Sequence, residues 1–331
     1  MSIPRELRDL ILAYIIQSPI SEAPEIVQSF SDLTSSRKIL AAPKLRSRNN
    51  TVLYPSSDPC PNTTSLLLTN HQLRSETLEQ INRPGANECD LDIIILDEIL
   101  PLPTWTRIPS LSKSFEKVNV TYRISGAYDV ANESRLVNDV EGPYEKYGQH
   151  KGFKWGGGTG IAIRWQIYSI LERFVRVGPR GETNDEHAHH HITVKTININ
   201  VETPAGVDLA LFDLPMKFPF STQRNPETVL SPVYLARFVA WNIEEVLQTT
   251  GYPEGLLPAG HHEWFRYGAV FFEHVDCVVV RLDGKVLMER DVAECLKNAG
   301  GFKEKHLSKQ DLAEYKRETW KVRRERGLRV L

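Results

Sequence analysis

The fold class of this chain is decided by one stretch, Lys117-Val118-Asn119-Val120-Thr121-Tyr122-Arg123-Ile124-Ser125. Apolar and polar residues alternate along it, which is the pattern of a β-strand with one buried and one solvent-facing side. Further strands are predicted at 90–96, 192–202 and 271–282, and the last is apolar on both faces, as in the centre of a sheet. Asp283-Gly284 then predicts a tight hairpin. Together these stretches predict one β-sheet.

Two long helices are predicted between these strands. One covers 160–177 and stops at a Gly-Pro pair, and the other begins after Ser231 as N-cap and ends before Gly251. A helix between two strands allows them to lie parallel with a right-handed crossover. Further helices are predicted at 292–299 and 308–326. The predicted fold class is therefore α+β, with a mixed β-sheet packed with helices.

A short amphipathic helix is predicted at the N-terminus, over residues 3–16. Pro4 suits its first position, because a proline there loses no helical hydrogen bond. The apolar residues of the helix recur at offsets of three and four, which places them on one stripe. The stripe consists of Leu7, Leu10, Ile11, Tyr14 and Ile15.

The composition of the chain after this helix predicts two parts, a helical segment and a larger body. A second short helix is predicted at 24–33, and the Ser-, Pro-, Asn- and Arg-rich composition of 34–64 predicts a long mobile insertion. Residues 66–81 then predict a single helix. We therefore expect a helical segment, 1–85, that leads into a mixed α/β body, 86–331, and shares one core with it.

Composition excludes several classes of protein. Of the 331 residues, 41% are hydrophobic and 25% are charged, which is typical of a globular chain. The net charge of -2 predicts no general attraction to nucleic acid or to an anionic membrane. The apolar runs are too short to span a bilayer, and the N-terminus lacks the features of a secretory signal. With four scattered cysteines, the sequence predicts an intracellular protein of the cytoplasm or nucleus.

Two stretches of the chain resemble the F-box motif. The first is Ile3-Pro4-Arg5-Glu6-Leu7 with the apolar residues 11–15, which resembles the opening of an F-box. The second is Leu66-Leu67-Leu68-Thr69-Asn70-His71-Gln72-Leu73-Arg74-Ser75-Glu76, which resembles the closing helix in lineage-specific F-box-like proteins of filamentous fungi. In that group an α+β body of poorly characterised function follows the motif.

The resemblance implies a non-catalytic protein-interaction protein. It implies that Pro4, Leu7, Ile11 and Tyr14 bind the Skp-type adaptor of a cullin-RING ubiquitin ligase, while the body recruits a target protein. The candidate partner-binding residues are Pro4, Leu7, Leu10, Ile11, Tyr14 and Ile15. The alternative is that the stripe packs on the body of its own chain, which leaves an interaction or scaffold protein with no link to a ligase.

A histidine-rich stretch offers a second alternative, a metal-dependent enzyme. In an extended chain His187, His189 and His191 would share one strand face, where three imidazoles are able to chelate a metal. The sequence shows no fourth ligand beside them, which favours a solvated loop ahead of a strand. We therefore expect no metal, no cofactor and no catalytic residue.

Two further stretches resemble binding motifs, but we prefer a structural interpretation of each. Gly156 to Gly160 opens a helix but lacks the glycine spacing of a nucleotide-binding loop, which favours a flexible hinge. The basic residues of 321–326 are typical of a nuclear-import or RNA-contact patch. However, a docked C-terminal helix with a charged outer face is predicted by the helical spacing of Leu312, Tyr315, Thr319 and Val322.

Overall fold

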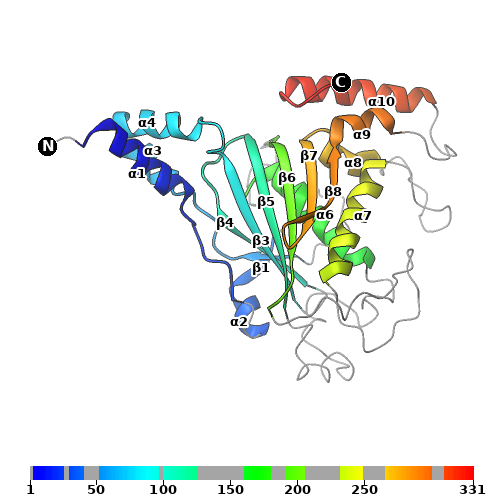
Figure 1. The fold of residues 1–331 in the computed structure, drawn as a ribbon, viewed down its shortest axis with the longest axis horizontal. Helices are drawn as coiled ribbons and strands as arrows, with labels where there is room; N and C mark the ends of the chain where they lie inside the picture. The colour runs from blue at the N-terminus through cyan, green and yellow to red at the C-terminus, as the bar shows by residue number, and fades with distance from the viewer. Residues whose placement is uncertain are drawn as a thin grey trace.

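A six-stranded mixed β-sheet lies at the centre of the molecule (Figure 1). The computed structural model describes residues 3–25, 30–40, 52–96, 100–125, 160–179, 191–205, 232–248, 265–299 and 309–331. The strands are β3 (Glu88–Leu96), β4 (Leu100–Arg107), β5 (Ser114–Ser125), β6 (Thr193–Glu202), β7 (Val275–Leu282) and β8 (Lys285–Asp291). Their order is β4-β3-β5-β6-β7-β8, with β3, β5, β6 and β7 parallel and the two edge strands antiparallel. The mixed sheet and its helices confirm the predicted α+β class.

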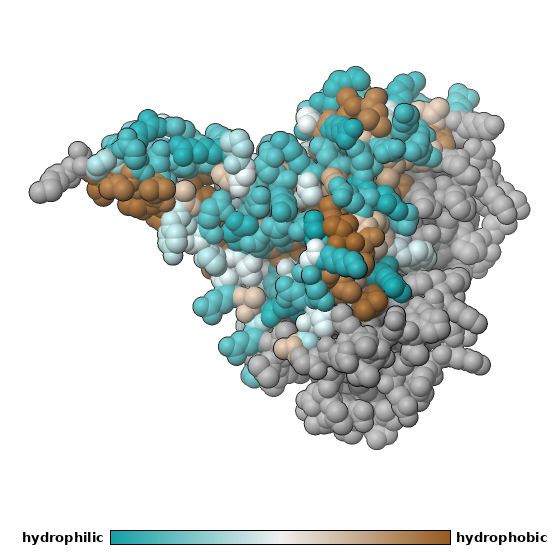
Figure 2. Space-filling view, in the orientation of Figure 1, coloured by the Kyte–Doolittle hydropathy of each residue, from teal (hydrophilic) through white to brown (hydrophobic). Residues whose placement is uncertain are grey.

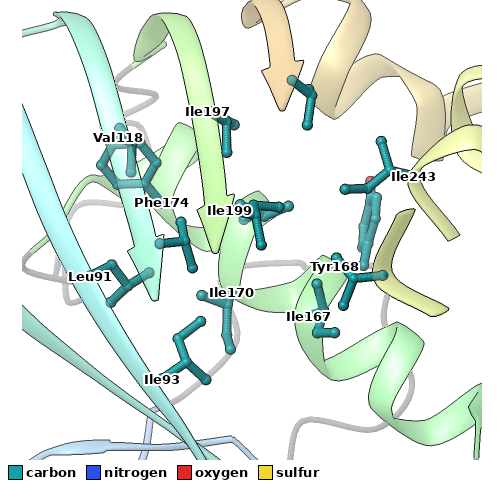
Figure 3. Close-up of a cluster of buried hydrophobic side chains, with 14 of the residues drawn as sticks. Leu91, Ile93, Val118, Ile167, Tyr168, Ile170, Phe174, Ile197, Ile199 and Ile243 are labelled. Atoms are coloured by element: carbon teal, nitrogen blue, oxygen red, sulfur yellow. The ribbon is translucent and has the colours of Figure 1, made fainter. Parts of the chain in front are cut away.

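One face of the sheet is packed with helices and forms the main core. The helices are α6 (Gly160–Val177), α7 (Pro232–Gln248) and α8 (Phe265–Phe272), close to the ranges predicted for the first two. Figure 3 shows side chains of β3, β5 and β6 meeting those of α6 and α7. Val120, Ile199 and Val280 are paired in register on adjacent strands, and all three are buried. The strands therefore turn their apolar sides toward the helices.

The opposite face of the sheet is apolar near the end of β3, where Ile94 and Leu96 belong to a second buried cluster, and it carries a polar row further along the strands. Asp90, Asn119 and Asn198 lie side by side on β3, β5 and β6. The Asn119 amide donates to Asp90 at 2.9 Å, and the Asn198 amide donates to Asn119 at 3.2 Å. Arg107 caps one end of this row by binding Asp90, and Arg281 caps the other by donating to Asn198 at 2.8 Å. These groups satisfy one another's hydrogen bonds, so this polar row is stabilised without apolar burial.

The C-terminal part covers the far end of the sheet. Asp283 and Gly284 both have positive φ, as the predicted tight hairpin requires, and they join β7 to β8. α9 (Val292–Asn298) follows, and α10 (Lys309–Glu325) docks near α8. The predicted strand at 271–282 begins later than expected, because Phe271 and Phe272 belong to α8.

The N-terminal part forms a helical arm at the other end of the sheet (Figure 1). The arm consists of α1 (Arg5–Gln17), α3 (Thr63–Thr69) and α4 (His71–Ile81), and both α1 and α3 pack against α4. One helix was expected over 66–81, but the structure has two. Asn70 lies between them and accepts a hydrogen bond from the Leu73 backbone N–H, which makes it the N-cap of α4.

The described residues between α1 and α3 include elements that pack on the body. They form α2 (Phe30–Ser35) and a small antiparallel pair of strands, β1 (Arg37–Ile39) and β2 (Leu53–Pro55). A mobile insertion was expected over 34–64, but Val52, Leu53 and Tyr54 are buried, and their apolar contacts hold this segment. Residues 41–51 lie outside the described part of the chain.

Candidate protein-interaction site on the N-terminal arm

Helix α1 carries apolar side chains on two opposite faces. Leu12 and Ile16 are buried inside the arm. The predicted stripe points the other way, with Leu7 51%, Leu10 67%, Ile11 48% and Tyr14 78% exposed. Pro4 is also exposed, and Ile15 lies at the margin of the stripe with intermediate exposure. The alternative that this stripe packs on the body is therefore not what the structure shows.

The exposed stripe forms a continuous apolar surface along the arm. Figure 2 shows hydrophobic residues gathered over α1 on the lower side of the arm, whereas the side formed by α4 is hydrophilic. A surface helix normally buries its apolar stripe and exposes its polar one. An apolar surface on both sides is expected of a helix that is packed between its own domain and a second molecule.

Charged pairs from α1 to α4 and to the residues just after α4 hold the helix in this orientation. The Arg8 guanidinium donates to both carboxylate oxygens of Glu76, at 3.0 and 2.7 Å. Arg83 binds Asp9 at 2.9 Å, on the same side of the helix. The hydrogen bonds from Arg8 lower the pKa of Glu76 to about 2. Rotating α1 to bury its stripe would break these contacts, so the outward orientation is specified by the sequence.

Replacing Glu76 with glutamine is expected to speed amide hydrogen exchange throughout α1, because Arg8 then loses its anionic acceptor. In the wild type, the contact between α1 and α4 is also expected to weaken as pH falls. The pKa of Glu76 is lowered in the folded protein, so its contribution is full above the ordinary carboxyl value of 4.5 and is lost as pH approaches about 2. Exchange measured by mass spectrometry at neutral pH checks the substitution.

The matched control is Glu79→Gln. Glu79 lies one turn further along α4 and pairs with Arg5, but both side chains are half exposed, and exposed pairs contribute little. Equal exchange in α1 for the wild type and Glu76→Gln would show that the pair does not hold the helix.

The other predicted residues do not form a site within the described residues. His191 is exposed, and its ring centroid lies 5.9 Å from that of His274, whereas His187 and His189 fall outside the described ranges. Among the residues that the structure describes, no group of three metal-ligating side chains occurs. Residues 156–159 of the glycine-rich stretch also lie outside them.

The basic C-terminal stretch is partly used by the fold. Arg323 is fully buried and donates to the carbonyls of Phe272 and Val275, and to the carboxylate of Asp276 at 2.7 Å. Arg326 donates to His274 and to the Glu273 carbonyl. These two arginines therefore dock the C-terminal helix and do not form part of an open basic surface. A docked helix was predicted, but with its charges on the outer face, whereas Arg323 is buried.

Comparisons with known protein families, with curated proteins and with solved structures found no match for this chain. Among the described helices, none has the length and apolar content needed to cross a membrane.

Proposed function

We propose that this protein is a non-catalytic interaction protein whose α1 stripe binds a Skp-type adaptor of a cullin-RING ubiquitin ligase, while its α/β body recruits a target protein. The observation that supports the proposal is the outward orientation of the stripe on a helix whose inner face is already packed. The resemblance to fungal F-box-like proteins supplies the identity of the partner. This function requires an intracellular location, in the cytoplasm or the nucleus.

The exposed side chains are chemically suited to protein binding. Burying an exposed leucine or isoleucine side chain contributes roughly 1.5–3 kcal/mol. Tyrosine is among the residue types that contribute most at interfaces, and Tyr14 is the most exposed member of the stripe. Leu7, Leu10 and Ile11 lie beside it on the same helix face, so one partner surface is able to cover all four side chains.

The test is co-purification of the full chain with a purified Skp-type adaptor, for the wild type and for Leu7→Asp. The variant is expected to fold normally because Leu7 is half exposed. A charge at the centre of an apolar contact is expected to cost at least about 2 kcal/mol, or roughly thirtyfold in affinity. The wild type should therefore retain the adaptor and the variant should lose it.

Leu287→Asp is the matched control, because Leu287 is a similarly exposed leucine on β8, at the far edge of the sheet. It should bind the adaptor as the wild type does. Undiminished recovery of the adaptor by Leu7→Asp would remove the stripe from the interface. Absence of adaptor binding by the wild type would leave an interaction protein with no link to the ligase.

A further inference from the structure

Hydrogen bonds make many of the contacts between the arm and the body, and Ile20, just after α1, packs on the main core. Neither of the two buried apolar clusters of the described structure contains a residue of α1, α3 or α4. Leu12 and Ile16 of α1 are buried but belong to neither cluster. The helices of the arm are therefore not part of the core of the body, and hydrogen bonds contribute to the angle between the two.

Arg107 makes the contact that joins α1 to the first two strands of the sheet. It is the last residue of β4, and it donates to both carboxylate oxygens of Asp90 on β3, at 2.6 and 3.0 Å. Its remaining terminal nitrogen donates to the side-chain oxygen of Gln17, the last residue of α1. The Gln17 amide nitrogen donates in turn to the Ala86 carbonyl at 2.9 Å, just before β3. The end of α1 is thus held between the ends of β3 and β4.

This contact also joins the arm to the polar face of the sheet. Asp90 accepts from Arg107 and from Asn119, which belongs to the row of amides that ends at Arg281 on β7. The side chain of Arg107 is only 19% exposed, and a bidentate guanidinium–carboxylate pair has a fixed planar geometry. The sheet therefore fixes the direction of the Arg107 side chain, and this direction sets the position of Gln17.

We infer that Arg107 is the positioning residue that fixes the angle at which the arm presents the α1 stripe relative to the sheet. The inference rests on the proposed function, since it concerns how a partner bound to the stripe is oriented. A partner bound to α1 is then held in one orientation relative to the body. An adaptor needs such a fixed orientation in order to place a target near a second protein. The Ile20 N–H and the Ser21 hydroxyl, just after α1, also donate to backbone carbonyls of β4, and the Thr63 hydroxyl donates to the Pro109 carbonyl. None of these contacts involves the side chain of Asp90.

The test measures the angle directly, as the distance between two spin labels in the full chain. Suitable sites are Ser75 on α4 and Glu289 on β8, which are both exposed and lie at opposite ends of the molecule. The labels are attached through a keto amino acid, because the native cysteines would compete for a thiol reagent. The wild type should give one narrow distance distribution.

Two substitutions should broaden this distribution. Gln17→Leu removes the arm side of the contact and leaves Asp90 paired with Arg107, and Arg107→Met removes the sheet side. Gln17→Glu loses the hydrogen bond to Ala86 but keeps an oxygen acceptor for Arg107, so it should keep the distribution narrow. Arg281→Met changes the other end of the row and serves as the control. Circular dichroism should show unchanged helix content in all four variants.

A distribution for Gln17→Leu and Arg107→Met as narrow as that of the wild type would overturn the inference. The result is independent of adaptor binding, because the distances are measured on the free protein. Gln17→Leu should also still bind the adaptor, since its stripe is intact. Failure of the wild type to bind would therefore refute the proposed function and leave the positioning result unaffected.

Discussion

Arg323→Met is expected to lower the free energy of unfolding by about 3–5 kcal/mol, because it removes a fully buried cation from the partly buried Asp276 and leaves buried carbonyls without a donor. Arg323 is fully buried, and its three nitrogens donate to the carbonyls of Arg329, Phe272 and Val275 and to the Asp276 carboxylate. Methionine fills a similar length but donates nothing. Four acceptors therefore lose a donor at once, and the docking of α10 on the sheet is weakened.

The neighbouring Arg324 provides the control for this substitution. Its side chain is exposed, and surface substitutions usually change the free energy of unfolding by less than about 0.5 kcal/mol. Urea unfolding of the wild type, Arg323→Met and Arg324→Met gives the comparison. If Arg323→Met unfolded at the same urea concentration as Arg324→Met, the buried arginine would not be what docks the C-terminal helix.

The second large effect is a loss of stability in mild acid that depends on His274. Its Nδ1 donates to the Ile192 carbonyl at 2.6 Å, and its Nε2 accepts from Arg326 at 3.0 Å. Both contacts are those of a neutral ring. Burial, and then the charge of Arg326, lower the pKa of His274 to about 3. The ring therefore stays uncharged in the folded protein at pH values where a free histidine is protonated.

The sign of the effect follows from the protons bound in each state. Below about pH 6.5 the unfolded chain takes up a proton at His274 and the folded chain does not, so acid favours unfolding until pH reaches about 3. One such group removes up to about 1.4 kcal/mol of stability for each pH unit. Urea unfolding between pH 7 and pH 4 should show this slope in the wild type, and a shallower slope in His274→Gln.

The exposed His71 on α4 provides the comparison for His274. His71→Gln should leave the pH dependence of the wild type unchanged. The same slope in the wild type and in His274→Gln would mean that the folded protein accommodates a charged His274 and that the neutral ring is not required for docking α10.

The regular elements of the body could be predicted from the sequence because their signals are local. The alternation along β5 and the helical period of α6 each depend on neighbouring residues, and the structure confirms both. β4 was not predicted, because Pro101 and Pro103 argue against a strand. The structure resolves the conflict by placing β4 at the edge of the sheet, where a proline is tolerated.

The candidate site could be predicted only in part. Helical spacing showed which residues of α1 share a face, but spacing does not show whether that face points inward or outward. That choice depends on pairs such as Arg8 with Glu76, which are 68 residues apart in the chain. The joint at Gln17 and Arg107 was not predicted for the same reason, since those residues lie 90 positions apart. Contacts between distant positions leave no periodic signal.

The most direct test of the central claim is a photo-crosslink from Tyr14, the most exposed residue of the stripe. The full chain would carry p-benzoylphenylalanine at this position and would be irradiated alone and with a purified Skp-type adaptor. We expect a covalent product with the adaptor that disappears when Leu7→Asp is added to the same chain. Crosslinks that map only to the protein's own sheet, with or without the adaptor, would contradict the account, because the stripe would then be covered by its own chain.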